Sequence, residues 1–330
     1  MVLKENWFEI LNKYKIDDIE YSYGYASLYG EPEMFLIEEK NTAAFLIFVY
    51  DKESKSFESP YGYSSFWTNS NDEIFINEFF ASFHAEMSKR GCVAGLIRYN
   101  PFIMPIKTEI VKNEFVRNVV YVDLKDSYMK KYSKRTQGDI KRAKEHNLDI
   151  DFSASERDFQ LFGDLYRSIM KEKKASDELL FTDEYFQKLS RLDKAFVLTA
   201  RKDDVFAGGS VFLLSGSTSY YHLSAVKDKK HLPGLSGLLL HCGIEHAFES
   251  KSEKIVLGGG LTSADDDSLL FFKEGFSQLK KQFFIGKMIV NEKEYKRLTA
   301  EHDEKNPHGV KLFLRYKYYN QGRNHERIRS

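Results

Sequence analysis

A histidine and a loop rich in lysine and glycine lie next to each other in the second half of the chain. His222 is in the strand-like run at 217–226, and the loop KDKKHLPGLSG follows directly at 227–237. A strand that leads through a loop into a helix can bind an anion, because the first N–H groups of a helix have no intrahelical partner. A histidine there could accept a proton from an amine that attacks a bound acyl group.

The same residues also have explanations without chemistry. A half-buried strand histidine with a satisfied hydrogen bond accounts for His222, and a solvated turn with a Pro-Gly break accounts for 227–237.

Aromatic and basic residues form a second candidate set, for binding a substrate. The loop SPYGYSSFW at 59–67 presents Tyr61 and Tyr63, whose rings could stack on a sugar. Arg98 ends a buried-looking strand, and Arg135 lies in the basic segment 128–147, so both could hold anionic groups of an acceptor. Surface packing of the rings and an interdomain ion pair of Arg98 are the alternatives.

The sequence contains no motif for several other kinds of chemistry. The glycine run 258–260 lacks the continuation of a P-loop and the spacing of a dinucleotide fingerprint, which predicts a tight turn. Asp265, Asp266 and Asp267 are expected to complement the N-terminal dipole of the next helix rather than to bind a metal. The nine histidines show no HExxH spacing, and there is no G-x-S-x-G motif. We therefore expect neither a metal site nor a serine hydrolase.

Alternating strand and helix patterns must position these residues. The first half predicts a hairpin at 32–51, a helix at 72–90, and strands at 93–99 and 114–124. The second half predicts the order β-α-α-β-β-β-α-β-α-β. Its strands are at 148–153, 195–201, 205–214, 217–226, 254–260 and 283–290, and its helices at 158–172, 182–192, 236–249 and 268–274. An antiparallel meander that passes into a β-α-β unit predicts an α/β fold with a mixed sheet.

Length and composition limit the number of domains that the chain can form. The chain has 330 residues and a mass of 38.5 kDa, with 42% hydrophobic and 30% charged residues, which predicts a folded protein of two domains. The change of character in the basic segment 128–147 suggests domains at 1–146 and 147–330. The 49 basic and 49 acidic side chains cancel, so we expect no DNA partner.

Cysteine content and hydropathy indicate the cellular compartment in which the protein is expected. Cys92 and Cys242 are the two cysteines, too few for a disulfide framework, and neither has a motif around it. The longest apolar run, at 43–50, has eight residues, whereas a membrane-spanning helix needs about 18. The N-terminal residues have no continuous apolar region of the kind found in a signal peptide. These features predict a cytoplasmic protein without a transmembrane segment.

Several short strings, in this order along the chain, resemble those of a known group. They are Pro60-Tyr61-Gly62-Tyr63, Ile97-Arg98-Tyr99-Asn100-Pro101, Val122-Asp123-Leu124, Lys134-Arg135, Ile140-Lys141-Arg142-Ala143-Lys144, Tyr221-His222-Leu223-Ser224, Leu257-Gly258-Gly259-Gly260, Ser268-Leu269-Leu270-Phe271-Phe272-Lys273 and Ile285-Gly286-Lys287. The chain thereby resembles GNAT-superfamily acyltransferases of the Fem-like kind, related to FemA and FemB and associated with surface polysaccharides. The resemblance implies two tandem GNAT domains packed side by side.

The resemblance also implies a location for the donor. An acetyl-CoA or other acyl-CoA co-substrate would bind the second domain, with its carbonyl near Ser224, Ala225 and Val226 and its phosphates near Gly234, Ser236 and Gly237. The first, degenerate domain would form the acceptor side, and no metal is needed. The sequence departs from the family in the string PYGYSS, where glycines are usual, and in the reduced phosphate signature HLPGLS.

These observations predict an N-acyltransferase that moves an acyl group to an amino group on a sugar or nucleotide-sugar precursor of a bacterial surface polysaccharide, which belongs to the cell envelope. Two alternatives stay open. One is a Fem-type aminoacyltransferase that uses aminoacyl-tRNA, with 128–147 facing the RNA. The other is a non-catalytic module that binds a glycan precursor, which the reduced phosphate signature favours. The sequence does not indicate the oligomeric state.

Overall fold

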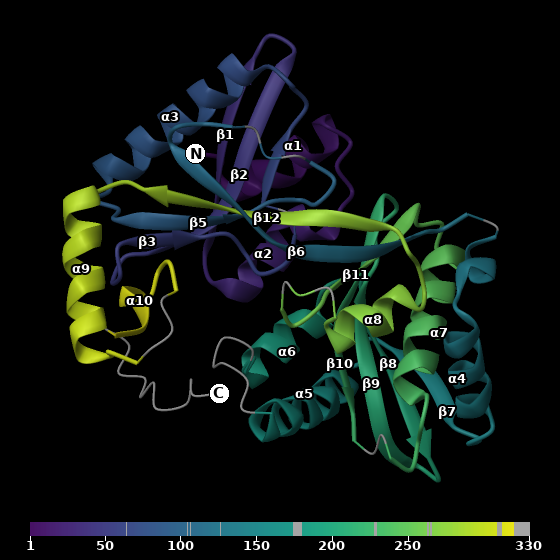
Figure 1. The fold of residues 1–330 in the computed structure, drawn as a ribbon. Coiled ribbons are helices and arrows are strands. Elements are labelled where there is room, and N and C mark those ends of the chain that lie inside the picture. The colour runs from purple at the N-terminus through teal and green to yellow at the C-terminus, as the bar shows by residue number, and fades with distance from the viewer. Residues whose placement is uncertain are drawn as a thin grey trace. The chain divides into compact units, whose positions relative to one another are not determined.

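The chain forms two compact units, which the computed structural model shows as ribbons in Figure 1. The structure describes residues 1–63, 65–103, 105, 107–125, 127–173, 180–227, 230–262, 264, 266–308 and 312–319. Unit 1 comprises Met1–Ile16, Glu20–Val116 and Phe283–Ser330, and unit 2 comprises Asp17–Ile19 and Arg117–Gln282. The boundary expected at residue 146 does not coincide with these units, because the basic segment lies inside unit 2 and the last part of the chain returns to unit 1.

Unit 1 is built on a mixed sheet. Its strands are β1 (Pro32–Glu39), β2 (Thr42–Asp51), β3 (Ser56–Glu58), β4 (Phe66–Thr68), β5 (Ala94–Arg98), the first half of β6 (Val111–Asp123) and most of β12 (Lys280–Ile289). β1 and β2 form the expected hairpin, β3 pairs with β5 in parallel, and β12 pairs with β5 antiparallel. Strands β6 and β12 contribute residues to both units because they continue past Val116 and begin before Phe283.

Strand β2 is buried on both sides, which explains its continuous apolar sequence. Leu46 and Phe48 face the core beneath α3 (Glu73–Lys89), whose Phe79 and Phe83 recur at helical spacing. The alternate residues of β2 pack with α1 (Trp7–Lys13). Asp72 begins α3 as an N-cap, as the sequence predicts, because its carboxylate accepts the N–H of Ile74 at 2.9 Å.

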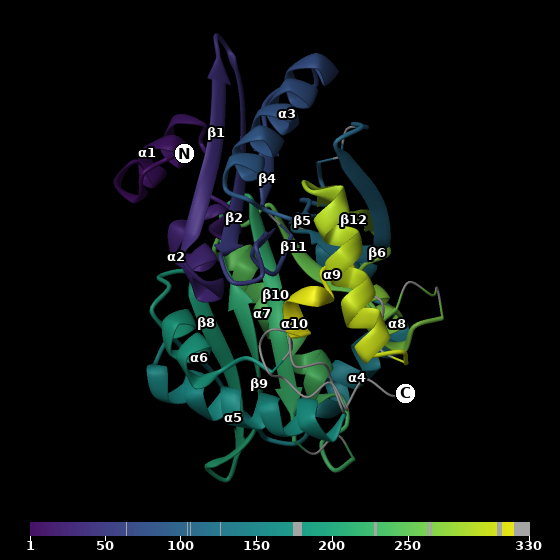
Figure 2. The same ribbon diagram turned by 90° about the vertical axis from the view of Figure 1, so that its left-hand side faces the viewer.

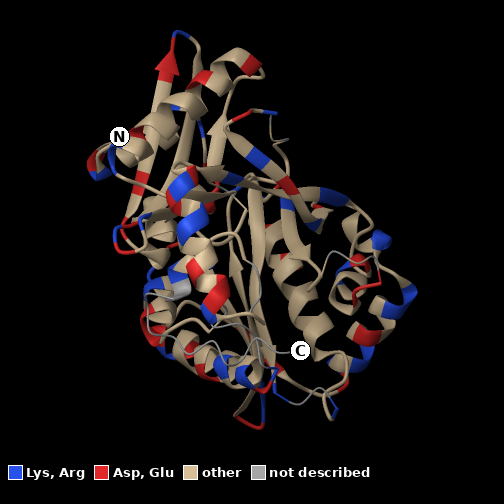
Figure 3. Ribbon diagram, turned by 60° about the vertical axis from the view of Figure 1, so that its left-hand side comes forward, with Lys and Arg blue, Asp and Glu red and all other residues tan. Residues whose placement is uncertain are grey.

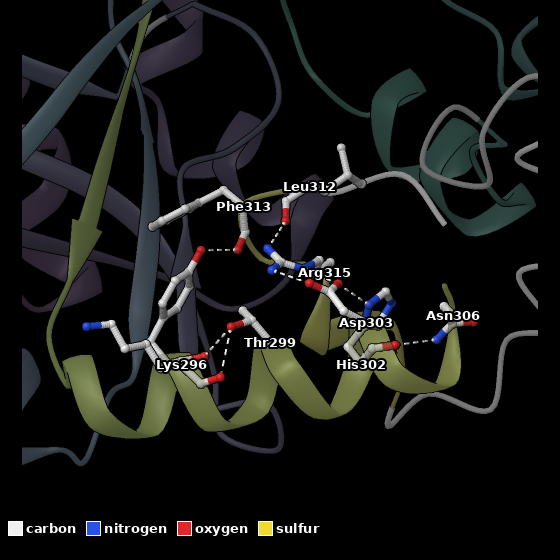
Figure 4. A network of polar contacts seen from close by, with 9 residues as sticks. Lys296, Thr299, His302, Asp303, Asn306, Leu312, Phe313 and Arg315 are labelled. Carbon is white, nitrogen blue, oxygen red and sulfur yellow. Dashed lines mark hydrogen bonds and ion pairs between the residues drawn. The ribbon is translucent and has the colours of Figure 1, made fainter. Parts of the chain in front are cut away.

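The end of the described chain folds back onto unit 1. Helix α9 (Glu292–Lys305) follows β12, and α10 (Tyr316–Tyr319) follows a turn. Figure 4 shows Arg315 held against the Asp303 carboxylate, with donor–acceptor distances of 2.7 and 2.9 Å. Leu314 and Tyr316 are buried in a cluster with Val93. These contacts attach the segment 312–319 to the start of β5 and to α9.

Unit 2 also has a mixed sheet, in the order β6-β11-β10-β9-β8-β7. Strands β7 to β10 form the predicted antiparallel meander, β10 and β11 run parallel, and β11 pairs with β6 antiparallel. The bounds are β7 (Asp149–Ser153), β8 (Ala195–Lys202), β9 (Val205–Leu213), β10 (Thr218–Val226) and β11 (Lys254–Gly259). Figure 3 shows that these central strands carry few charged residues, whereas Lys and Arg alternate with Asp and Glu on the helices and loops.

Helices cover both faces of this sheet, as Figures 1 and 2 show. The helices α5 (Glu156–Glu172) and α6 (Asp183–Ser190) lie on one face, and α4 (Lys134–Lys144) and α7 (Leu235–Glu249) on the other. Glycines allow the close approach: a Cβ on Gly163 of α5 would meet the ring of Phe186 at 2.5 Å, and one on Gly243 of α7 would collide with Phe212. The remaining helices of this unit are η4 (Tyr128–Lys131) and α8 (Ser268–Glu274).

The predicted fold class is confirmed, since both units are mixed α/β structures. Several element bounds differ from the expectation: for example, β6 begins three residues earlier, at Val111, β12 begins at Lys280 instead of 283, and α5 begins at Glu156 instead of 158. Among the described residues, no helix is both long and apolar enough to cross a membrane.

Candidate functional site

Two parallel strands in the middle of the unit 2 sheet separate after a short pairing. β10 and β11 pair from Thr218 with Lys254 to Tyr220 with Val256, although both strands continue further. Each strand has a register shift just beyond this point, at His222 in β10 relative to β9 and at Leu257 in β11 relative to β6. A bulge bends its strand and re-aims side chains. The carboxyl ends of β10 and β11 therefore diverge, which is where open α/β sheets bind ligands.

Small residues on β9 support the diverging part of β10. Gly208 pairs with Val226 and Gly209 pairs with Ala225, and a Cβ on Gly208 would lie 2.8 Å from the carbonyl oxygen of Ala225. Ser210 Oγ donates to Ser224 Oγ at 3.0 Å. The structure thus places Ser224, Ala225 and Val226 on the separated end of β10, where the resemblance expects the donor carbonyl.

Helix α7 follows β10 and begins at the predicted loop, of which Asp228 and Lys229 lie outside the described residues. Gly234 is its N-cap with φ +84°, a backbone conformation that favours glycine. A Cβ on Gly234 would collide with the carbonyl of Asp139 on α4, so packing alone explains this glycine. Ser236 and Gly237 are in the first turn, and Gly237 has no atom within 4 Å of an added Cβ. Their N–H groups belong to the set that a helix leaves for an anion.

His222 has a hydrogen-bond partner on another element. Its Nε2 lies 2.6 Å from the Tyr185 hydroxyl of α6. Burial lowers the pKa of His222 to about 4, so the imidazole is neutral at pH 7. A neutral imidazole of such low pKa is a weak proton acceptor. The hydrogen bond agrees with the structural explanation of this residue, and its catalytic role stays a prediction.

A buried lysine that the sequence analysis did not assign lies at the end of β11. Lys273 of α8 is 7% exposed, and its Nζ donates to the carbonyl of Gly259 at 2.7 Å. Burial and, to a smaller extent, the Arg117 guanidinium lower the pKa of Lys273 to about 7, while Asp267 opposes the shift. Near pH 7 this amine exists in both protonation states, a property of groups that transfer protons.

The glycine run does not form the predicted tight turn, because Gly258 and Gly259 belong to β11 and pair with Val120 and Val119 of β6. Gly258 has φ +83°, and an added Cβ on Gly260 would lie 2.5 Å from the Asp267 carboxylate. Asp267 caps α8 by accepting the N–H groups of Leu269 and Leu270 at 2.9 and 3.0 Å. That cap agrees with the expected dipole role, although Asp265 lies outside the described residues. Arg117 donates to the carbonyl of Gly260.

A sequence signal for Lys273 was present in the apolar string SLLFFKE. Leu270 and Lys273 are three residues apart and therefore lie on the same face of α8, and both are buried. A lysine on the apolar face of a short helix is uncommon, because a buried ammonium costs free energy unless it has a partner.

The predicted aromatic loop of unit 1 is held by a buried carboxylate. Glu20 is 1% exposed and accepts the N–H of Tyr63 at 2.6 Å, and the Tyr25 hydroxyl donates to the carbonyl of Tyr61 at 2.7 Å. Gly62 has φ +122°, and an added Cβ would lie 2.6 Å from Glu20 Oε1. Tyr61 is 40% exposed, so its ring can contact a ligand. Sequence reasoning missed Glu20, and the altered position Ser64 lies outside the described residues.

The two predicted arginines lie in different units. Arg98 in unit 1 donates to the carbonyl of Ser59 at 2.7 Å and lies 3.6 Å from Glu58, so its ion pair is within the unit and not between domains. Arg135 of α4, in unit 2, is largely exposed, with its guanidinium 5.4 Å from the centre of the Phe271 ring. Tyr61, Tyr63 and Arg98 thus belong to unit 1, and the predicted catalytic and donor residues belong to unit 2.

Comparison with known proteins identifies the fold. No protein-family model matches the chain, and no curated protein is detectably similar in sequence. The solved structure of FemX is similar with a TM-score of 0.65 at 10% identity, covering 90% of this chain and 98% of FemX. The chain has a GNAT-type, Fem-like fold. The C-terminal domain of a putative lysylphosphatidylglycerol synthetase from Agrobacterium fabrum shares it, with a TM-score of 0.57 at 14% identity over 88% of this chain and 92% of that one.

A Bacteroides thetaiotaomicron protein of unknown function has the same Fem-like fold, with a TM-score of 0.55 at 9% identity over 87% of this chain and 98% of that one. The fold predicted from the short strings is therefore confirmed. Within the described residues of this Fem-like fold, no group of three or more His, Cys, Asp and Glu side chains is placed to hold a metal ion.

Proposed function

We propose that the protein is an N-acyltransferase that moves an acyl group from an acyl-CoA-type donor to an amino group on a sugar or nucleotide-sugar precursor of a bacterial surface polysaccharide. The divergence of β10 and β11 after Tyr220 and Val256 carries this proposal. An acyl-pantetheine arm would lie between the separated strands, where those backbone N–H groups of 224–226 that point away from β9 can donate to the thioester carbonyl. The first turn of α7 then meets the phosphates.

The reaction needs few protein groups. The amine nitrogen attacks the carbonyl carbon, the C–S bond breaks, and the proton lost from nitrogen must reach the thiolate. Holding the two reactants in contact supplies much of the rate, and donors aimed at the developing oxyanion supply more. A proton carrier with a pKa near the working pH completes the set.

Lys273 is a better candidate for the proton carrier than His222. The pKa of Lys273 is about 7, whereas that of His222 is about 4. As an amine Lys273 could take the proton of the attacking nitrogen, and as an ammonium it could stabilise the oxyanion. The Nζ atom of Lys273 is hydrogen-bonded to the carbonyl of Gly259, at the end of β11, which diverges from β10.

Two variants separate these roles of Lys273. Lys273→Arg keeps a cation that cannot deprotonate, and Lys273→Met removes the charge. Partial acyl transfer by the arginine variant indicates oxyanion stabilisation, and equal loss in both variants indicates proton transfer. Full activity of the methionine variant would exclude both roles.

Unit 1 would supply the acceptor contacts. The exposed ring of Tyr61 can stack on a sugar face, and Tyr63 and Arg98 lie on the same loop and its neighbouring strand. Arg98 forms an ion pair with Glu58, whose carboxylate also accepts a hydrogen bond from Lys317 Nζ at 2.6 Å. An anionic acceptor would therefore compete with Glu58 for Arg98, whereas the more exposed Arg135 of unit 2 has a looser carboxylate partner, Asp139 at 3.9 Å.

Aminoacyl transfer from tRNA is the second candidate. The likeness to FemX extends over 90% of the chain, and α4 carries an exposed basic face with Lys134, Arg135 and Lys141. This function predicts binding of aminoacyl-tRNA whose affinity falls steeply with salt, because each phosphate contact releases counterions.

Calorimetric titration with CoA and acetyl-CoA tests the leading proposal. A Gly237→Glu variant places a carboxylate in the first turn of α7, where it would repel phosphates. Gly138→Glu is the control for a carboxylate placed on a helical glycine with no atom within 4 Å of an added Cβ, and because Gly138 is exposed while Gly237 is buried, melting temperatures must show that both variants are folded. Saturable binding that is lost in Gly237→Glu and kept in Gly138→Glu supports the proposal.

No binding at millimolar CoA contradicts an acyl-CoA donor. In that case, titration with aminoacyl-tRNA separates the second candidate from a non-catalytic module. Saturable binding of aminoacyl-tRNA, compared with the deacylated form, supports the aminoacyltransferase.

A further inference from the structure

A solvent-open hollow of about 690 Å³ lies in unit 2 at η4, α4 and α7. It is lined by charged and polar residues from all three elements, with Met129 and Ile140 as the apolar part. The polar lining consists of Lys130, Tyr132, Gln137, Lys141, Lys144 and His241. A hollow of this volume is in the range of small-molecule sites.

The charge of the lining is positive. Lys130, Lys141 and Lys144 bring three ammonium groups to one hollow, and within the described part of the chain none of them forms an ion pair. Asp139, the acidic residue of α4, pairs instead with Arg142 and Arg135. Neighbouring ammonium groups without counter-charges repel one another, and an anion between them removes this repulsion.

Two buried polar atoms lie in the same wall. The Tyr132 hydroxyl and the His241 Nδ1 atom have no hydrogen-bond partner, and these residues are only 6% and 7% exposed. The two rings touch edge to face, with their centres 5.8 Å apart. Buried polar atoms in native proteins are rarely left without a partner, so an unpaired pair beside a hollow indicates an absent ligand or ordered water.

The protonation states match a ligand that accepts hydrogen bonds. Burial raises the pKa of Tyr132, so its hydroxyl keeps its proton and can donate. Burial lowers the pKa of His241, and Glu245 and Lys144 act on it with opposite signs, so the ring is neutral near pH 7 and carries one N–H. Three ammonium groups and a hydroxyl donor suit phosphate, whose several oxygens only accept.

We propose that this hollow binds the phosphate group of a small organic molecule, of the size of a sugar phosphate or a nucleotide. The lysines attract the phosphate, and the Tyr132 hydroxyl donates to it once the side chains that cover this atom turn aside. We choose a small ligand over RNA because the unpaired atoms of Tyr132 and His241 are buried beneath the open hollow, where only a small group could reach them. This site goes beyond the proposed function, since His241 is in the middle of α7 and not in the first turn expected to meet the donor.

The test is calorimetric titration of the full chain with inorganic phosphate, glucose 1-phosphate and ADP. Tyr132→Phe removes only the hydroxyl. Tyr128→Phe is its matched control, because the Tyr128 hydroxyl is also buried without a partner but does not line the hollow. We expect an organic phosphate to bind more tightly than inorganic phosphate. Tyr132→Phe should weaken that binding by roughly tenfold, and Tyr128→Phe should leave it unchanged.

A lysine pair gives a second comparison. Lys144→Met should weaken binding several-fold, whereas Lys134→Met, on the same helix but outside the hollow, should not. Melting temperatures show whether each variant is folded.

Three results would overturn the proposal. One is the absence of heat with all three phosphates at about 10 mM, a concentration at which even weak sites fill. Another is equal weakening by Tyr132→Phe and Tyr128→Phe, or by Lys144→Met and Lys134→Met, which would indicate a diffuse surface effect. The third is binding of an RNA hairpin alone, with no response to the small phosphates.

Discussion

Lys273 on α8 donates its Nζ proton to the carbonyl of Gly259 at 2.7 Å, which ties a buried ammonium to the end of β11. The turn that follows Gly259 is fixed by Asp267 and Arg117, which bond to its backbone. The local structure thus holds a lysine of lowered pKa in one position instead of letting its flexible chain reach solvent. Such an arrangement costs stability while the amine is charged, and it persists only where the surrounding bonds hold it.

The pKa of Lys273 predicts how stability depends on pH. Its pKa falls from 10.5 in the unfolded chain to about 7 in the folded one. Between these values the unfolded chain binds a proton that the folded chain does not, so the free energy of unfolding rises with pH. From pH 7 to pH 9 this group should add about 2–3 kcal/mol.

Lys273→Met should remove that rise. Urea unfolding at pH 7, 8 and 9 measures it, with Lys281→Met, at an exposed position of β12, as the control. Parallel pH dependence of the wild type and the Lys273→Met variant would contradict the lowered pKa.

The lowered pKa of His222 predicts that the stability of the fold depends on pH in the acidic range. Its folded pKa of about 4 lies below the ordinary value of 6.5, so between these values the unfolded chain again binds more protons. Stability is therefore lost as the pH falls from about 6.5 to about 4. Between pH 6.5 and pH 5 the loss due to this residue should be at most about 2 kcal/mol.

His222→Gln should make the acid transition shallower, and His84→Gln, at a half-buried position of α3, should not. Thermal unfolding followed by circular dichroism between pH 5 and pH 7 compares the three proteins. An equally steep transition in His222→Gln would show that other groups carry the acid sensitivity.

Two glycines three residues apart at the start of α7 should respond in opposite directions to alanine. Gly234 has φ +84° and no room for a Cβ beside Asp139, so Gly234→Ala should destabilise unit 2 by about 2 kcal/mol or more. Gly237 is helical with open space, so Gly237→Ala should stabilise the protein by about 0.5–1 kcal/mol. Chemical denaturation measures both. Destabilisation by both variants would mean that the first turn of α7 is more tightly packed than the structure shows.

The sequence predicted most helices and strands well, because hydrophobic periodicity depends on local residues. The helix at 158–172 and the meander at 195–226 follow from such local patterns, whereas the turn expected at 258–260 is the paired end of β11. The division of the chain was not predictable in this way, since the return of 283–330 to unit 1 depends on pairing between β12 and β5, which are far apart in sequence.

The candidate site shows the same limit. The position of Ser224 on a strand followed by a helix could be expected, but the early separation of β10 from β11 depends on register shifts at His222 and Leu257. Lys273 and Glu20 escaped notice because burial of a charged residue depends on tertiary packing, which composition does not reveal.

Glu20 should control the aromatic loop of unit 1. Its carboxylate accepts the N–H of Tyr63 and fills the space beside Gly62, so Glu20→Gln keeps the shape but weakens a charge-assisted hydrogen bond. We expect a loss of about 1–3 kcal/mol in the free energy of unfolding. Glu31→Gln is the control, because the Glu31 carboxylate is exposed and accepts a hydrogen bond from the Tyr23 hydroxyl at 2.7 Å on the protein surface. If the two variants lose the same stability, Glu20 does not hold this loop.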